Sequence, residues 1–258
     1  MLYKLDIDQR GVATVTLNRP ELHNAFNDDL IRDLIVCFND LENNSGVRLV
    51  ILTGEGKSFC AGADLNWMKR MKDYSHEENV KDSQNLAELF TVINRFTRPV
   101  IGKINGSALG GGAGLVACCD YVVAVDTATI AFTEVRLGLL PAVISPFVIA
   151  KIGESHARAS FLSGAKISMS RAFVMGLVHQ VTTSEHLDAE IEKVVADFLL
   201  AGPSAAVRAK ELINRVVRAE TMEDARDFTC EMIAKARAGA EGQEGMSALL
   251  EKRKASWY

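Results

Sequence analysis

The sequence predicts an α/β protein with a helical C-terminal section, and two observations carry this prediction. In the first half, strand patterns and amphipathic helix patterns alternate along the chain, which is typical of α/β folds. After Gly202-Pro203 only helix patterns with charged faces remain. We therefore place a domain boundary at this dipeptide, with an α/β core at residues 1–202 and a helical section at 203–258.

The first half begins with a hairpin and continues with helices and strands. Residues 3–18 alternate in hydrophobicity around a turn at 8–11, which predicts two paired strands. Asn27 is the expected N-cap of a helix that carries apolar residues at helical spacing through Leu41. Further strands are expected at 47–53, 100–104, 121–125 and 129–132, with helices around 86–93 and at 115–119.

The second half is mainly helical. Ser145-Pro146 predicts an N-cap followed by proline at the first helical position, and Gly153 is the expected end of that helix. Additional helices are expected near 156–162, 170–175, 185–200, 204–219 and 221–238, with a lone strand at 178–181.

Composition excludes several classes of protein. The 258 residues are 48% hydrophobic, which excludes wholesale disorder, and 29 Lys+Arg against 33 Asp+Glu leave a net charge of −4. This balance argues against a nucleic-acid partner or an anionic membrane surface. Five cysteines, an odd number, form no disulfide framework, and the N-terminus lacks the pattern of a signal peptide. We expect a soluble cytoplasmic protein with no membrane partner.

Motifs for metals and nucleotides are missing. The five histidines never pair at i, i+3 or i+4, and the cysteines are not at metal-ligand spacing, so no metal site is expected. The segment Gly54–Ser58 lacks the upstream glycine of a phosphate-binding loop. The glycine run at 110–114 likewise departs from the dinucleotide-binding spacing.

Two segments rich in small residues, 58–65 and 105–114, each follow a predicted strand. Small residues at a strand end or helix start expose backbone N–H groups, and two such groups can hold an oxygen that gains negative charge. The alternative is that these glycines only permit close packing of helix against sheet. The pattern alone leaves both interpretations open.

The same two segments, Phe59-Cys60-Ala61-Gly62-Ala63-Asp64-Leu65 and 105–112, resemble the crotonase (enoyl-CoA hydratase/isomerase) superfamily. The resemblance extends over essentially the whole chain, through 17–20, 24–25, 119–120, 132–141, 244–246 and 251–253. It implies a crotonase-like ββα spiral core, followed by helices that complete the active-site wall or an oligomer contact. Residues 63–68 and 141–146 are most similar to bacterial methylglutaconyl-CoA hydratases.

The resemblance implies roles for particular residues. Glu134 matches a catalytic acid/base glutamate, whereas the position of the family's second glutamate is occupied by Gly114. For Glu134 the alternative is a solvated turn residue paired with Arg136. The N–H groups of Ala63 and Gly111 match the oxyanion hole that binds the thioester oxygen. Binding of coenzyme A is implied for Ala61, Asp64, Leu65, Lys252 and Lys254, although the two lysines fit a solvated helix face equally well.

The roles implied by the resemblance predict a hydratase that acts on a short, branched 2-enoyl-CoA, and 3-methylglutaconyl-CoA is one candidate substrate. No cofactor is expected besides the coenzyme A of the substrate. The absence of a carboxylate at Gly114 keeps open a one-glutamate enoyl-CoA isomerase. An alternative of another class is a non-catalytic acyl-CoA-binding scaffold. The resemblance further implies a homotrimer or a dimer of trimers.

Overall fold

Two β-sheets form the framework of residues 1–96 and 100–191, the first of two units in the computed structural model, which describes residues 1–258. The larger sheet has six strands, and all neighbours run parallel except the first pair, a hairpin as predicted. Its order is β1 (Tyr3–Ile7), β2 (Val12–Leu17), β3 (Leu49–Gly54), β5 (Val100–Ile104), β7 (Tyr121–Val125) and β10 (Gln180–Thr182).

The smaller sheet runs in the order β4 (Ser58–Cys60), β6 (Ser107–Leu109), β8 (Thr129–Ala131) and β9 (Ile167–Ser168). The first three strands are parallel, and β9 is antiparallel to β8. Each of β4, β6 and β8 follows a strand of the larger sheet after a few residues, and each is followed by helix. This repeated strand–strand–helix turn confirms the predicted ββα spiral.

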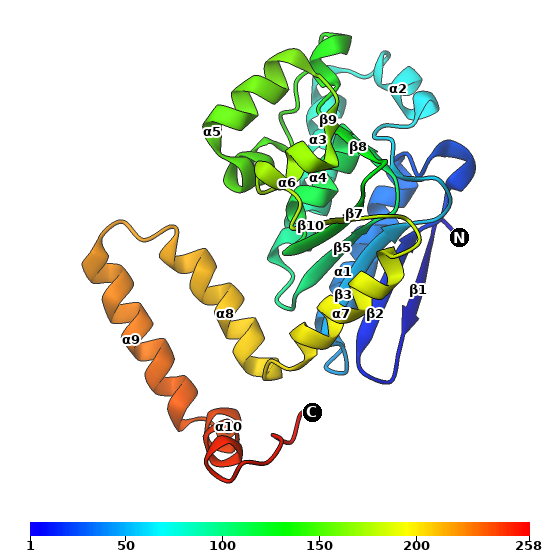
Figure 1. The fold of residues 1–258 in the computed structure, drawn as a ribbon. Coiled ribbons are helices and arrows are strands. Elements are labelled where there is room, and N and C mark those ends of the chain that lie inside the picture. The colour runs from blue at the N-terminus through cyan, green and yellow to red at the C-terminus, as the bar shows by residue number, and fades with distance from the viewer. The chain divides into compact units, whose positions relative to one another are not determined.

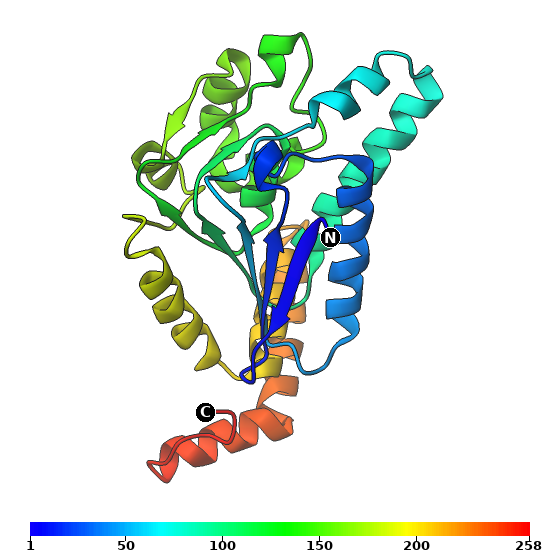
Figure 2. The same ribbon diagram turned by 90° about the vertical axis from the view of Figure 1, so that its right-hand side faces the viewer.

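Two long helices lie side by side against the larger sheet, α1 (Asp28–Asn43) and α3 (His76–Arg95) (Figures 1 and 2). The Asn27 side chain accepts a hydrogen bond from the N–H of Leu30, which confirms the predicted N-cap. Ser75 and Glu78 form a reciprocal capping box that fixes the start of α3. Both helices turn their buried apolar residues toward the interior of this unit.

Four further helices lie around the smaller sheet: α2 (Leu65–Met71), α4 (Gly111–Cys118), α5 (Ser145–Ser163) and α6 (Met169–Val174), with short 3-10 turns η1 (Pro20–Leu22) and η2 (Glu134–Leu137). Helix α5 begins at Ser145 itself, so the predicted N-cap is wrong by one residue and Ile144 holds that position. The Ser145 hydroxyl instead donates to the carbonyl of Ala142, 2.7 Å away. Gly153 has φ +71 and interrupts α5, which then resumes.

The second unit comprises residues 97–99 and 192–258. Its helices are the end of α7 (Leu187–Leu199), the hairpin of α8 (Pro203–Val216) and α9 (Met222–Ala238), and α10 (Ala240–Leu250) (Figure 1). No strand occurs after Thr182, as expected. The two units divide within α7, whereas the predicted boundary at Gly202-Pro203 coincides with the start of α8. No helix of the chain has the length and apolar character needed to cross a bilayer.

Candidate active site

The loops that follow β4, β6 and β8 lie together at the C-terminal ends of these strands, which we call the edge of the smaller sheet. Because β4, β6 and β8 are parallel neighbours, the residues that follow them emerge on the same side. A carbon built as a Cβ on Gly62 would lie 3.8 Å from the backbone nitrogen of Gly111. A Cβ on Gly110 would lie 3.3 Å from Oε1 of Glu134. The structure thus brings the segments of Ala63, Gly111 and Glu134 together, although they are far apart in the sequence.

The N–H groups of Ala63 and Gly111 have no acceptor within the protein. Ala63 forms an isolated parallel bridge with Phe26, in which the N–H of Phe26 donates to Gly62 and that of Asp64 donates to Phe26. In this pattern the N–H of Ala63 itself points to the other side, and the residue is exposed. Gly111 opens α4, and the first N–H groups of a helix lack intrahelical acceptors.

Glycines allow these backbones to approach one another. Gly62 has φ +89, and a Cβ there would stand 2.9 Å from the carbonyl oxygen of Leu109. A Cβ on Gly112 would stand 2.2 Å from the carbonyl oxygen of Cys60. The structure confirms the close packing of the backbones, and it leaves the N–H groups of Ala63 and Gly111 without acceptors, as the other interpretation requires.

Glu134 is half-buried at the start of η2. Its Oε2 atom is buried and has no hydrogen-bond partner. Burial raises the pKa of this carboxyl group, and a hydrogen bond from its own backbone N–H opposes the effect only in part. The alternative pairing with Arg136 is not formed, since the guanidinium donates to the carbonyl of Ser163, 3.2 Å away. A carboxyl group with a raised pKa at such an edge is a candidate general acid/base.

Gly114 lies one helical turn after Gly110 and donates to its carbonyl oxygen at 3.2 Å. A Cβ on Gly114 would lie 2.3 Å from Cγ2 of Ile144 and 2.9 Å from Cε1 of Phe90. Ile144 belongs to the apolar loop before α5, and Phe90 is a core residue of α3. The place that the family resemblance gives to a second glutamate is therefore closed by apolar side chains.

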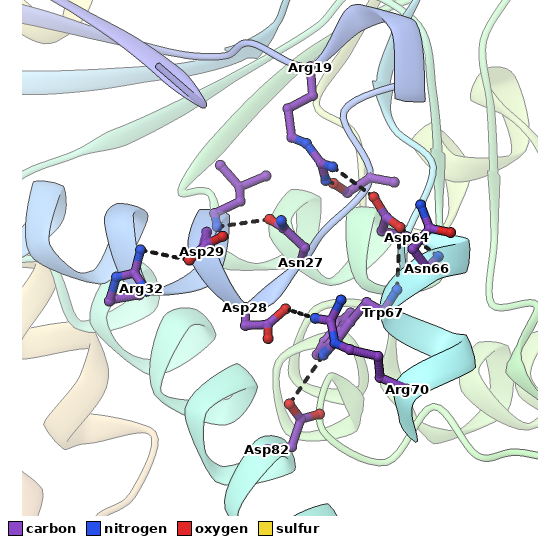
Figure 3. Close-up of polar contacts among 12 residues, drawn as sticks. Arg19, Asn27, Asp28, Asp29, Arg32, Asp64, Asn66, Trp67, Arg70 and Asp82 are labelled. Carbon is purple, nitrogen blue, oxygen red and sulfur yellow. Dashed lines mark hydrogen bonds and ion pairs between the residues drawn. The ribbon is translucent and has the colours of Figure 1, made fainter. Parts of the chain in front are cut away.

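Asp64 is only 5% exposed, and both of its carboxylate oxygens are used inside the protein (Figure 3). Oδ2 forms an ion pair with Nη2 of Arg19 at 2.7 Å, while Oδ1 accepts from the N–H groups of Asn66 and Trp67 and caps α2. Burial opposes the charge, but the hydrogen bonds from Arg19, Asn66 and Trp67 outweigh it and hold the pKa of Asp64 below its usual range. Sequence reasoning noted Arg19 only within the resemblance and assigned it no role.

The other residues predicted to bind coenzyme A lie at different places. Ala61 is half-buried just after β4, and Leu65 at the start of α2 is 74% exposed. Lys252 and Lys254 are exposed beyond α10 in the second unit, where Arg253 between them forms ion pairs with two glutamates. Among possible nucleophiles, burial raises the pKa of the Cys60 thiol to about 12, which keeps it protonated. No group of three or more potential metal ligands converges anywhere in the chain.

Comparison with known proteins identifies relatives along the whole chain. A family model described as enoyl-CoA hydratase/isomerase matches residues 8–258. The crotonyl-CoA hydratase of Syntrophomonas wolfei is 32% identical, with 96% of this chain and 95% of the relative covered. The 1,2-epoxyphenylacetyl-CoA isomerase of Escherichia coli is 31% identical, with 95% and 94% covered. A crystal structure of an enoyl-CoA hydratase from Shewanella pealeana has a TM-score of 0.95 at 33% identity, with 100% and 96% covered.

Proposed function

This chain belongs to the enoyl-CoA hydratase/isomerase family, and from that premise we propose that it adds water to a short, branched 2-enoyl-CoA. One observation carries the proposal. The carboxyl group of Glu134, with an unpartnered buried oxygen, stands at the same sheet edge as the unpartnered N–H groups of Ala63 and Gly111. A proton-transfer group beside two fixed N–H donors is what enolate chemistry on a thioester requires.

The proposed reaction uses Glu134 twice. The carboxylate first takes a proton from water while the hydroxide adds to C3 of the enoyl group. The electron pair of the C2–C3 double bond then moves toward the thioester, and the carbonyl oxygen becomes an enolate oxygen. The N–H groups of Ala63 and Gly111 stabilise this charge, an effect of about 3 kcal/mol per donor in acyl-transfer enzymes. Protonated Glu134 finally returns the proton to C2, so one water is added.

Two features of the chain support a branched, acidic acyl group such as 3-methylglutaconyl. The half-buried ring of Phe147, whose centroid lies 6.1 Å from that of Phe90, offers an apolar contact on which a methyl branch is favoured. Arg136 has no carboxylate within ion-pair distance, so its guanidinium is available to a second substrate carboxylate.

We assign the coenzyme A arm to the backbone of Ala61–Ala63 and to Leu65. The carboxylate of Asp64 takes no part in that contact because it is used internally. No cofactor besides the coenzyme A of the substrate enters the proposed reaction.

A second candidate is an enoyl-CoA isomerase that moves a proton between C2 and C4. The closed position at Gly114 favours it, because a single carboxyl group is sufficient for a proton shuttle while hydration must also hold a water. A non-catalytic acyl-CoA-binding scaffold is disfavoured, because a buried carboxyl oxygen without a partner destabilises the fold and brings nothing to binding alone.

The test compares the native enzyme with Glu134→Gln on crotonyl-, 3-methylcrotonyl-, 3-methylglutaconyl- and 3-enoyl-CoA. Loss of the conjugated-thioester absorbance together with a mass gain of one water reports hydration. We expect hydration by the native enzyme and at least a hundredfold lower turnover in the variant, with coenzyme A affinity retained. If the native enzyme converts 3-enoyl-CoA to 2-enoyl-CoA without hydrating it, the protein is an isomerase and the proposed hydratase function is refuted. Native-like turnover by Glu134→Gln refutes the role of Glu134.

A further inference from the structure

We propose that Arg19 is a positioning residue that fixes the orientation of the Ala63 N–H toward the enolate oxygen. The inference rests on the proposed function, since it concerns the same oxyanion hole. It assigns to the buried Arg19–Asp64 ion pair a task in the reaction beyond stabilising the fold.

The guanidinium of Arg19 joins two chain segments that flank the bridge between Phe26 and Ala63. Its Nη2 donates to Oδ2 of Asp64 at 2.7 Å, and its Nη1 donates to the carbonyl oxygen of Ala25. Ala25 directly precedes Phe26, and Asp64 directly follows Ala63. One planar, two-armed donor therefore sets the spacing of the two strands of the bridge.

The peptide that carries the Ala63 N–H needs such a restraint. Gly62 precedes it with φ +89, and glycine has the widest backbone freedom of any residue. The bridge offers only two hydrogen bonds, from Phe26 to Gly62 at 2.6 Å and from Asp64 to Phe26 at 2.8 Å. Without the Arg19 contacts, the peptide between Gly62 and Ala63 is held only by the bond from Phe26 to its carbonyl oxygen, and we expect its N–H to be less precisely oriented toward the substrate oxygen.

Arg19 is itself held in place from two sides. Its backbone N–H donates to Oδ1 of Asn24, and its carbonyl oxygen accepts from the N–H of Asn24. The side-chain amide of Asn24 also donates to the carbonyl of Glu55, in the turn before β4, and to that of Ser58, the first residue of β4. Asn24 is fully buried. Asn24 therefore connects Arg19 by hydrogen bonds to the start of β4, the strand that precedes Ala63.

A nearby ion pair provides a matched control. Arg70 on α2 pairs with Asp28 at the start of α1, close to the same segment, but both side chains are about half exposed (Figure 3). Exposed pairs contribute little, whereas the Arg19–Asp64 side chains are 9% and 6% exposed. Arg70→Lys therefore reproduces the chemistry of the change without touching the bridge.

The experiment measures the ionisation of bound acetoacetyl-CoA, whose enolate is followed by its ultraviolet absorbance in the native enzyme, Arg19→Lys, Asp64→Asn and Arg70→Lys. Lysine keeps the charge of Arg19 but loses the two-armed geometry, and asparagine removes the ion pair with little change of size. In both we expect the pKa of the bound ligand to rise by about one pH unit, a tenfold loss of enolate. The turnover number should fall about tenfold or more, while KM and butyryl-CoA affinity stay within threefold. Arg70→Lys should match the native enzyme.

Thermal melting by circular dichroism establishes which variants are folded, and Asp64→Asn serves if Arg19→Lys does not fold. An unchanged ligand pKa in either folded variant overturns the positioning role of Arg19. A loss that appears equally in Arg70→Lys overturns it as well. If the native enzyme itself does not lower the pKa of bound acetoacetyl-CoA, the oxyanion hole of the proposed function fails, and the inference fails with it.

Discussion

At the scale of single residues, Glu134 connects reactivity with stability. Its carboxyl group is held where burial raises the pKa, and one oxygen has no partner. The folded protein therefore binds this proton more tightly than the unfolded chain does. The stability that Glu134 contributes is complete below the unfolded pKa and is lost as the pH rises through the folded pKa.

Glu134→Gln should consequently raise the melting temperature at pH 8, by about 2 °C or more. Glutamine has a similar shape but never acquires a charge, so the difference from the native protein should shrink as the pH is lowered toward 4. Differential scanning calorimetry across this range measures the effect. Exposed Glu88 provides the control, because Glu88→Gln should give no such trend. A variant that melts lower than the native protein at pH 8 contradicts the assigned cause.

The contribution of the Gly111 N–H to turnover can be separated from the effect of adding a side chain at this position. A Cβ there would lie 2.8 Å from Cε2 of Phe26, so any side chain presses on that ring. Gly111→Ala and Gly111→Pro both introduce this carbon, but only proline removes the N–H, at a first helical position that accepts proline. We expect turnover of Gly111→Pro to be about a hundredfold below that of Gly111→Ala. Equal rates for the two folded variants exclude Gly111 from the hole.

At the scale of elements, one face of α4 decides the shape of the site. Gly110 turns toward Glu134, and Gly114, one turn later, turns toward Ile144 and Phe90. The loop before α5 supplies Ile144, and α3 supplies Phe90. The apolar loop before α5 therefore fills the space that a side chain at position 114 would occupy.

Restoring a carboxylate at this position requires space. Gly114→Glu alone should destabilise the protein by about 1–3 kcal/mol and lower both hydration and isomerisation, because its Cβ meets Ile144 at 2.3 Å. The double variant Gly114→Glu/Ile144→Gly should recover folding, with Phe90 shifting by a few tenths of an ångström. Two neighbouring carboxyl groups then raise one pKa, so its pH–rate profile should move to higher pH.

Denaturant unfolding and initial rates on crotonyl-CoA measure both effects, with Ile144→Gly alone as the control. Native stability of the single variant Gly114→Glu refutes the closed packing at this position.

At the scale of the whole molecule, the second unit is notable for exposed apolar side chains. They lie on its helices and beyond their ends, and the most exposed are Val217, Met222, Leu249 and Leu250, each at least 78% exposed. A contact between subunits that covers these side chains removes their apolar surface from water.

We predict that the protein forms a homotrimer or a dimer of trimers through this section. Static light scattering at micromolar concentration should give three or six times the chain mass of 28.1 kDa. Leu249→Lys/Leu250→Lys should shift the population toward smaller species, because buried lysines oppose association. A native protein that remains monomeric under these conditions rules the prediction out.

The elements that the sequence predicts well are those with a strong local signal. The hairpin at 3–18, the N-cap at Asn27 and the strands β5 and β7 depend on alternation, capping and apolar runs that neighbouring residues decide. Helices α2 and α10 and the short strands β4 and β6 were not predicted. They span too few residues, or carry too weak a period, for a local pattern to stand out.

By itself, the sequence determined the α/β class, because apolar periodicity acts over short stretches, and it marked the small-residue segments 58–65 and 105–114. The spiral and the roles of Ala63, Gly111 and Glu134 came from the resemblance to the family. The tertiary structure alone decided the state of those residues. Asp64 caps α2 and forms an ion pair with Arg19, 45 positions earlier, and the space beside Gly114 is filled by a loop from another element. Such partners meet only when the strands stack, and burial, which sets the pKa of Glu134, exists only in the folded chain.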